Sequence, residues 1–361
     1  MKTVDHKCPS CNASINYNPK EKNWVCEYCG SKFTLEQLEE NEKNFEETNV
    51  NNSKELKNEK KTSQKENEEN VEMDEYYCED CGARIVADKN TAATFCVYCK
   101  NTAILKSRLT EKFSPSKIIP FTKTKEEAIE AFKSVGKGKF LMPKEFSDSK
   151  NIQEITGVYV PFWLYSCKMK GHVKGKGTKV TTWSTYDYIY TKTDTYNVER
   201  EGIYDFDKIP VDGSVRFNDA VMNSIEPFKY EELTKFSYSY LSGFLAEKYD
   251  VEKDEAKKIT IDRAKQSCIS DLETKARASG YSTFYSDNKE TTINEENIDY
   301  VLLPVWMLNI KYNEKIYTFA MNGQTGKMIG DIPYSKNKAF IFWFVLFIIV
   351  FAIVALITYL I

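Results

Sequence analysis

The sequence has few of the groups that catalysis and nucleic-acid binding commonly use. Only two of its 361 residues are histidines, so histidine-based catalysis has little material. The net charge is −3, and the basic field of a protein that binds nucleic acid non-specifically is therefore missing. The first ten residues contain no apolar stretch, so we expect no signal peptide.

The sequence also lacks a phosphate-binding loop of the Walker type. Such a loop reads Gly-x-x-x-x-Gly-Lys-Ser/Thr, so that backbone amides surround the phosphates and the hydroxyl holds Mg²⁺. The nearest segments are GHVKGKGTK and NGQTGKM, and neither has that spacing. We interpret Gly323 to Lys327 as a hairpin turn. Because no nucleophile, base and orienting group stand in a recognisable spacing either, we expect no enzyme activity.

One long apolar run is present, at residues 339–361. Its 23 residues carry no charge, and a helix of this length would be about 34 Å long, enough to cross the hydrocarbon core of a bilayer. We therefore expect a transmembrane helix in contact with membrane lipid, in a single-pass, tail-anchored protein of the cell membrane. Lys336 and Lys338 precede the run, so the positive-inside rule places residues 1–338, with the N-terminus, in the cytoplasm.

Eight of the ten cysteines form two matching quartets. Each quartet consists of two C-x-x-C pairs separated by 14 residues, as in CPSCNASINYNPKEKNWVCEYC. We predict two zinc ribbons, at residues 1–35 and 76–107, each with one structural Zn²⁺, because four thiolates complete a tetrahedral site. The metal would supply folding energy that such small modules lack. The predicted ligands are Cys8, Cys11, Cys26 and Cys29 in ribbon 1, and Cys78, Cys81, Cys96 and Cys99 in ribbon 2.

Redox pairs and an iron–sulfur cluster are the competing interpretations of these cysteines. The cytoplasm is reducing, so disulfides are not expected there. A redox C-x-x-C motif would occur once, at the start of a helix that follows a strand, and the symmetric quartets favour zinc instead. The remaining cysteines, Cys167 and Cys268, have apolar neighbours and are expected to be small buried residues rather than nucleophiles.

The rest of the chain divides into a linker and a body. Residues 36–75 consist mainly of Asn, Glu and Lys and cannot bury enough apolar surface to fold, so we predict a disordered charged linker. Residues 108–335 mix helical and strand patterns, with a helix from about Thr124 to Lys133. The predicted fold class is α+β, with two N-terminal zinc ribbons, a duplicated mixed α/β body and one C-terminal transmembrane helix.

The duplication rests on a second internal repeat. The segments VYVPFWLY and VLLPVWML, which we call the P-x-W units, align Pro161 with Pro304 and Trp163 with Trp306. Each follows an acidic helix opening, KEEAIEAF or KDEAKKIT. Chance similarity between two apolar strands is the competing interpretation. The segment that contains KDEAKKIT has helical spacing. It predicts a helix with one buried face, formed by Ala256, Ile259, Ala264, Ile269 and Leu272.

A basic strip precedes a run of aromatic residues. Every second residue from Lys168 to Lys176 is a lysine, except for His172, so these side chains would share one side of a strand. We expect a solvated edge strand, and contact with anionic lipid, a protein partner or nucleic acid are the alternatives. The aromatic residues that follow are expected to pack a sheet face; they are Trp183, Tyr186, Tyr188 and Tyr190.

The double ribbon, the P-x-W units and the stretch YTFAMNGQTGKMIGDIP resemble a family of bacterial membrane proteins described as having a TFIIB-type zinc ribbon. The resemblance covers nearly the whole chain. Some relatives carry a label borrowed from the primosomal replication helicase, which the missing phosphate-binding loop does not support. Others resemble membrane components found beside phage-shock and SPFH-type proteins in envelope-stress systems. The family implies zinc ligands and no established biochemical activity.

These patterns together predict a non-enzymatic adaptor or scaffold for protein partners at the membrane. The resemblance implies partners of the SPFH or phage-shock type and a role in envelope stress. Nucleic-acid binding by the ribbons is the alternative, although neither ribbon is markedly basic. An enzyme with its site in the body is the third interpretation.

Overall fold

The structure, a computed structural model, shows a mixed α+β protein, as the sequence predicts. Ribbon 2 is described only in part, and its predicted ligands Cys78, Cys81, Cys96 and Cys99 lie outside the described residues. The predicted linker, residues 36–75, is described only at its two ends. The described residues are 7–41, 73–77, 84–88, 91–95, 102–104, 114–146, 152, 154–215 and 219–360.

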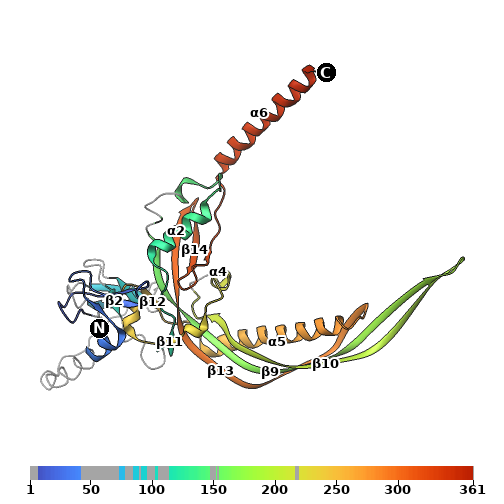
Figure 1. Cartoon of the computed structure of the whole chain (residues 1–361), viewed down its shortest axis with the longest axis horizontal. Helices are drawn as coiled ribbons and strands as arrows, with labels where there is room; N and C mark the ends of the chain where they lie inside the picture. The colour runs from blue at the N-terminus through green and yellow to red at the C-terminus, as the bar shows by residue number, and fades with distance from the viewer. Residues whose placement is uncertain are drawn as a thin grey trace, which may run out of the picture.

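Figure 1 shows an elongated molecule in which a central sheet carries ribbon 1 on one side and a long curved arm on the other. The strands are β1 (Asn16–Asn18), β2 (Asn23–Val25), β3 (Lys32–Phe33), β4 (Met73–Tyr77), β5 (Arg84–Asp88), β6 (Thr91–Phe95), β7 (Thr102–Ile104), β8 (Lys117–Ile118), β9 (Thr156–Ser184), β10 (Ile189–Asp212), β11 (Thr234–Lys235), β12 (Leu245–Glu247), β13 (Thr283–Tyr312), β14 (Lys315–Asn322) and β15 (Met328–Ile329). The helices are α2 (Lys125–Gly136), α4 (Asp219–Ser224), α5 (Lys253–Arg277) and α6 (Lys336–Leu360), with short 3-10 helices η3 (Lys144–Phe146), η4 (Tyr230–Glu232) and η5 (Tyr238–Leu241).

Ribbon 1 is the small sheet β1-β2-β3, and a helix at residues 35–41 follows it. Leu38 of this helix is buried against the ribbon and the body. The predicted boundary at residue 35 therefore falls at the start of a helix, and residues 36–41 are helical rather than part of a disordered linker. The apolar Leu35 and Leu38, one helical turn apart, provide the buried surface that the charged sequence after them lacks.

The central sheet has the strand order β11-β8-β13-β9-β12-β6-β7, and β10 and β14 pair with β9 and β13. The predicted module at residues 76–107 is not separate from this sheet, because its strand β6 pairs with β12 of the body. Ala93 of β6 lies opposite Ala246 of β12, and both are completely buried. Small side chains at this position let the added strand pack closely on the core.

α2 begins where the sequence predicts because Thr124 caps it. The Thr124 amide donates to Glu127 Oε2 at 2.8 Å, and the Glu127 amide donates to Thr124 Oγ1 at 3.4 Å. This reciprocal capping box satisfies two amides that the helix leaves unpaired. Ala128 and Phe132 then face the core, where Phe132 contacts Phe319 of β14 at 4.9 Å between ring centroids.

The two P-x-W units lie side by side at the centre of the sheet. Pro161 of β9 is opposite Leu302 of β13, and Pro304 of β13 is opposite Tyr159 of β9. Each unit also pairs in parallel with the short strand that precedes the helix of the other repeat. β8, before α2, pairs with β13, and β12, before α5, pairs with β9. A local two-fold axis therefore relates the two units, and each has equivalent neighbours in the sheet.

The contacts around the two units match one another. The indole of Trp163 donates to the carbonyl of Val251, and the indole of Trp306 donates to the carbonyl of Lys123, both at 2.9 Å. A duplicated unit of helix and strands would leave such matched pairs. Duplication itself stays a prediction. Two loop amides repeat the match. The Gly213 amide donates to the Pro161 carbonyl at 2.9 Å, and the Gly323 amide donates to the Pro304 carbonyl at 2.8 Å.

The arm consists of residues 166–208 of β9 and β10, helix α5, and residues 283–298 of β13. Its three strands curve, with α5 on the concave side (Figure 1). Register shifts between Phe206 and Ile209 of β10 and along β13 mark irregular pairing, which bends strands and increases their twist.

α5 packs on the arm through small side chains. Ile259, predicted to face inward, is 38% exposed. A Cβ added at Gly171 of β9 would lie 2.2 Å from Cys268 Sγ, so the helix and sheet approach closely at this point. A face of large isoleucines would not fit that spacing. The buried face is Ala256, Thr260, Ala264, Cys268, Leu272 and Ala276.

α6 carries large apolar side chains that are exposed along its whole length. It is long and apolar enough to cross a membrane, and it begins at Lys336 rather than at residue 339. Its start is attached to the body. The Ser335 amide donates to the Leu141 carbonyl at 2.8 Å, and Lys338 Nζ donates to the Met142 carbonyl at 2.7 Å.

Candidate metal centre

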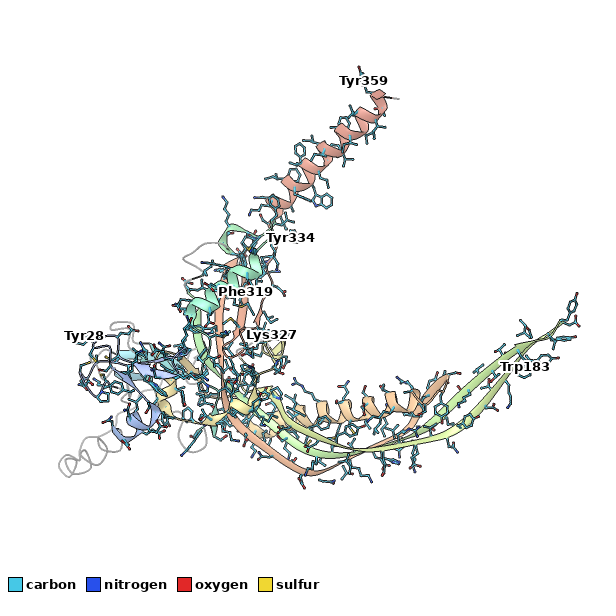
Figure 2. The ribbon with its side chains drawn as sticks, viewed as in Figure 1. Tyr28, Trp183, Phe319, Lys327, Tyr334 and Tyr359 are labelled. Atoms are coloured by element: carbon cyan, nitrogen blue, oxygen red, sulfur yellow. The ribbon has the colours of Figure 1, made fainter. Side chains whose placement is uncertain are left out.

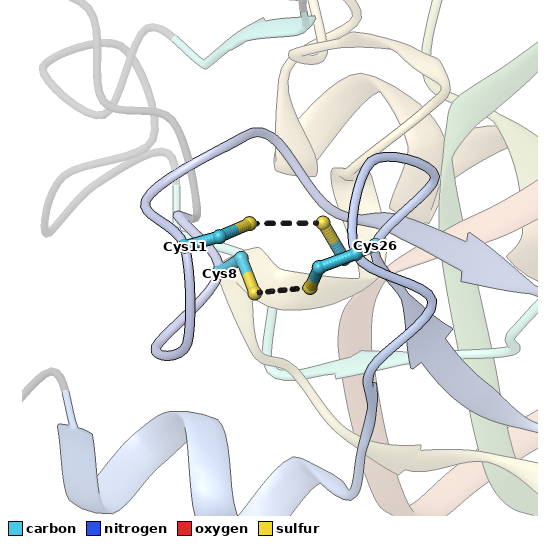
Figure 3. Close-up of side chains that lie close together, drawn as sticks. Cys8, Cys11 and Cys26 are labelled. Atoms are coloured by element: carbon cyan, nitrogen blue, oxygen red, sulfur yellow. Dashed lines mark hydrogen bonds between the residues drawn. The ribbon is translucent and has the colours of Figure 1, made fainter.

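Two tight turns of ribbon 1 bring its four cysteines together. In the first turn the Asn12 amide donates to the Cys8 carbonyl at 2.8 Å, and in the second the Gly30 amide donates to the Cys26 carbonyl at 2.9 Å. Asn12 and Gly30 each follow the second cysteine of a turn and have φ of 63° and 73°, a conformation that Asn and Gly adopt most easily. The hairpin of β1 and β2 joins the two turns and orients them toward each other (Figure 3).

The four sulfur atoms form a compact cluster. Cys8 Sγ lies 3.6 Å from Cys29 Sγ, and Cys11 Sγ lies 3.5 Å from Cys26 Sγ (Figure 3). All four lie within 4.8 Å of one another. Tetrahedral Zn²⁺ with Zn–S bonds of about 2.3 Å would separate its sulfur ligands by about 3.8 Å. The cluster therefore has the dimensions of a four-sulfur metal site.

The thiols of this cluster do not ionise alike. Hydrogen bonds with the Ser31 side chain and backbone lower the pKa of Cys29 to about 6. Cys11 differs, because the hydrogen bond with the Ala13 backbone lowers its pKa while burial and the neighbouring cysteine sulfurs raise it, with a net value of about 12. A negative charge on one sulfur therefore disfavours ionisation of the neighbouring thiol. A divalent cation would remove that opposition and allow four thiolates to coexist.

These four cysteines could hold a metal ion, and their donor set is consistent with zinc. Four sulfur ligands leave no open coordination position, so a metal bound here would be structural and would not activate a substrate. It would fix the two turns to each other across the hairpin, where ribbon 1 has little apolar surface of its own. The second quartet lies outside the described residues, so the second Zn²⁺ stays a prediction.

Ribbon 1 docks on the body through one face of its hairpin. Trp24 Nε1 donates to the Ser239 carbonyl at 2.7 Å, and the Tyr17 amide donates to the Ser242 carbonyl at 3.2 Å. The rings of Tyr17, Trp24 and Tyr240 form a triangle with centroid separations of 5.0, 5.2 and 5.5 Å. Trp24 is only 2% exposed, so this aromatic triangle joins the ribbon core to that of the body.

The docking site on η5 could not be recognised from the sequence. Trp24 and Ser239 are 215 positions apart, and local patterns carry no information on such a contact. The one available signal is the density of aromatic residues around η5.

A groove of about 520 Å³ remains beside the interface, and its lining includes Tyr17, Thr124 and Trp306.

The other candidate residues lie in the arm. Cys167 and Cys268 are buried, as predicted, and burial raises the pKa of both thiols, which makes them poor nucleophiles. The basic strip does lie on one exposed face of β9. Three of its lysines form ion pairs with glutamates of the neighbouring strands, so most of its charge is compensated within the arm. The pairs are Lys168 with Glu295, Lys170 with Glu201, and Lys174 with Glu199.

The fold and the site define a mixed α+β protein with a four-cysteine cluster near the N-terminus and an apolar C-terminal helix that could cross a membrane. The chain is 39% identical over 238 residues to a protein of Bacillus subtilis (strain 168) described as "Uncharacterized protein YdjG". The aligned region covers 65% of this chain and 69% of that protein, so the chain belongs to the YdjG family. No family model and no solved structure matches the chain.

Proposed function

We propose that this protein is a membrane-anchored, non-enzymatic scaffold that holds protein partners at the cytoplasmic face of the cell membrane. The observation that carries the proposal is the closed four-sulfur cluster of ribbon 1, together with the docking of that ribbon on the body. A closed site offers no position for a substrate, and a docked ribbon is a fixed part of the molecular surface. Such a surface is suited to binding another protein.

The proposed role of zinc is to shape this surface. With Zn²⁺ bound to Cys8, Cys11, Cys26 and Cys29, the hairpin is held in the conformation that docks on the body. The two turns that carry the cysteines face outward. Tyr28 of the second turn is 84% exposed and lies on the outer edge of the ribbon (Figure 2). Exposed tyrosines are common anchors of protein interfaces, so this edge is the proposed contact for a partner.

The proposed role of α6 is to place that surface at the membrane. Its 25 residues make a helix of about 37 Å, enough to span the hydrocarbon core. The contacts of Ser335 and Lys338 with the body hold the start of the helix in place. The resemblance noted in the sequence supports partners of the SPFH or phage-shock type and a role in envelope stress.

Crosslinking and affinity capture of the full-length protein from its own membrane test this proposal. We expect one reproducible set of membrane-associated proteins, which is lost in Cys8→Ser and reduced in Tyr28→Ala. Tyr285→Ala is a matched control, because Tyr285 is also exposed but lies on the arm. Recovery of nucleic-acid machinery alone, or capture that is unaffected by Cys8→Ser, would count against the scaffold.

A further inference from the structure

The far end of the arm exposes a group of large aromatic and apolar side chains. We call Trp183, Tyr186, Tyr188, Ile189 and Tyr190 the aromatic tip. Their exposed fractions are 48%, 103%, 67%, 78% and 44%. The expectation that the aromatic residues pack a sheet face holds for Trp183 and Tyr190, which stack across the strand pair, and is wrong for Tyr186 and Tyr188, which lie in the turn. Figure 2 shows Trp183 near the end of the arm, far from the core. A soluble surface rarely carries such a group without a partner.

The fold leaves the aromatic tip uncovered because its supporting elements end before it. β13 begins at Thr283, opposite Thr178 of β9, and α5 ends at Arg277. Of the residues that the structure describes, only the strands β9 and β10 continue beyond Thr178, and an isolated two-stranded hairpin is marginally stable in water. No described element therefore covers either face of the tip, and burial of either face would stabilise it.

The aromatic tip is ordered within itself. Trp183 is opposite Tyr190 in the register, and their rings stack at 5.6 Å with an interplanar angle of 13°. The Tyr188 ring lies 6.3 Å from that of Tyr190. The Thr185 amide donates to the Tyr188 carbonyl at 2.8 Å and closes the turn. The result is a preformed aromatic surface with indole and phenol groups at its edges.

This segment lacks the positive charge that an anionic partner would need. From Val180 to Thr191 the only charged residue is Asp187. Lys179, just before the segment, lies 5.7 Å from the ring centroids of Tyr196 and Tyr281, and Lys192, just after it, pairs with Asp194 at 2.9 Å. A phosphate-rich partner would need free positive charge here. Neutral Trp and Tyr instead match the layer where lipid headgroups meet acyl chains.

The curvature of the arm brings this surface toward the side on which α6 leaves the body. Figure 1 shows the concave face of the arm and the raised end of the hairpin on that side. The irregular register of β10 and β13 builds the bend into the arm. A bilayer crossed by α6 therefore lies on the side that the aromatic tip faces.

We propose that the aromatic tip inserts into the interfacial layer of the same bilayer that α6 crosses. The inference rests on the proposed membrane anchoring of α6. The arm would then be supported at both ends, by the body at one end and by the bilayer at the other. Because the tip lacks basic charge, insertion should require neither anionic lipid nor low salt.

The test uses the full-length protein in phosphatidylcholine vesicles with an environment-sensitive fluorescent amino acid, which is incorporated at one position by stop-codon suppression so that the ten native cysteines stay unlabelled. The three labelled positions are Tyr186 in the tip, Ile203 in the arm and Leu346 in α6. Ile203 is 74% exposed and lies opposite Lys170, on the strand face that does not contact α5. We expect spin-labelled lipid to quench the labels at positions 186 and 346 and to leave the label at position 203 in a water-like state.

The three labels separate failure of this inference from failure of the anchor. Quenching at position 346 with a water-like label at position 186 would overturn the inference and leave the anchored scaffold intact. A water-like label at position 346 would overturn both. Quenching at position 186 that appears only with anionic lipid, or disappears at about 0.5 M salt, would also overturn the inference, because charge would then drive insertion.

A second measurement tests the aromatic side chains themselves. The triple change Trp183→Ser, Tyr188→Ser and Tyr190→Ser should abolish most of the quenching at position 186. Tyr285→Ser is the matched control and should leave that quenching unchanged, since Tyr285 is 72% exposed but stands on the three-stranded part of the arm. Equal quenching in the triple variant and the wild type would overturn the assignment of insertion to these rings.

Discussion

Replacing Trp24 by phenylalanine should loosen ribbon 1 from the body without changing the predicted metal ligands. The variant loses the indole N–H that donates to the Ser239 carbonyl at 2.7 Å. The buried carbonyl oxygen then lacks this donor. An unsatisfied buried group costs about 1–3 kcal/mol. Trp24→Ala would also remove the contacts with Tyr17 and Tyr240, at about 3–5 kcal/mol.

Hydrogen exchange of the full-length protein measures this loosening directly. A cost of about 1–3 kcal/mol corresponds to roughly 5- to 150-fold faster exchange in residues 16–25, if their amides exchange through opening of the docked ribbon. Exchange in the arm should not change. The matched control is Tyr28→Ala, an exposed position of the same ribbon, which should stay within about 0.5 kcal/mol of the wild type. Unchanged exchange of residues 16–25 in both Trp24 variants would refute the docking argument.

Three further predictions concern the body and the arm. Gly171→Ala should lower Tm by forcing a Cβ to 2.2 Å from Cys268 Sγ, at about 1–3 kcal/mol, and Cys268→Ala should recover part of this loss. Trp163→Phe and Trp306→Phe should each lower the free energy of unfolding by about 1–3 kcal/mol, because each leaves one carbonyl without its indole donor; very unequal losses in denaturant unfolding would contradict the two-fold match. Burial raises the pKa of Glu226 to about 7, so between the ordinary carboxyl pKa and 7 the folded protein holds more protons than the unfolded chain. Stability from this group should therefore fall as pH rises through that range, and Tm profiles of Glu226→Gln should lack this component.

Local features of the structure could be predicted because the sequence itself carries their physical cause. The spacing of Cys8, Cys11, Cys26 and Cys29 fixes two turns on one hairpin, and the cluster forms as expected. Thr124 with Glu127 marks the start of α2, and the uncharged run after Lys338 marks the body of α6. Each of these signals acts within a few residues or one helical turn.

Long-range features could not be predicted in the same way. Nothing in the local pattern shows that β9 runs unbroken for 29 residues, from Thr156 to Ser184, before the chain turns within the run of aromatic residues. Strand propensity does not limit length, and this length depends on pairing with β10 and β13 and on the packing of α5. Ile259 was placed inside by helical period alone, whereas the close approach at Gly171 selects small side chains for that face.

The basic strip shows how partners in space change an interpretation. In the sequence, Lys168, Lys170 and Lys174 form a row of one sign that could meet anionic lipid or nucleic acid. In the structure their ion pairs with glutamates on β10 and β13 compensate that charge. The exposed pairs add little stability, but they remove the long-range field that a phosphate partner would require.

Zinc content measured together with hydrogen exchange of residues 16–25 tests most directly whether the four-cysteine site holds ribbon 1 in its docked form. We predict about two Zn²⁺ per chain in the purified full-length protein, one fewer in Cys26→Ser, and faster exchange of residues 16–25 in that variant. Cys167→Ala replaces a buried cysteine outside the quartets and should keep both ions. Unchanged zinc content in Cys26→Ser, or a ribbon that stays protected after losing its metal, would contradict the account.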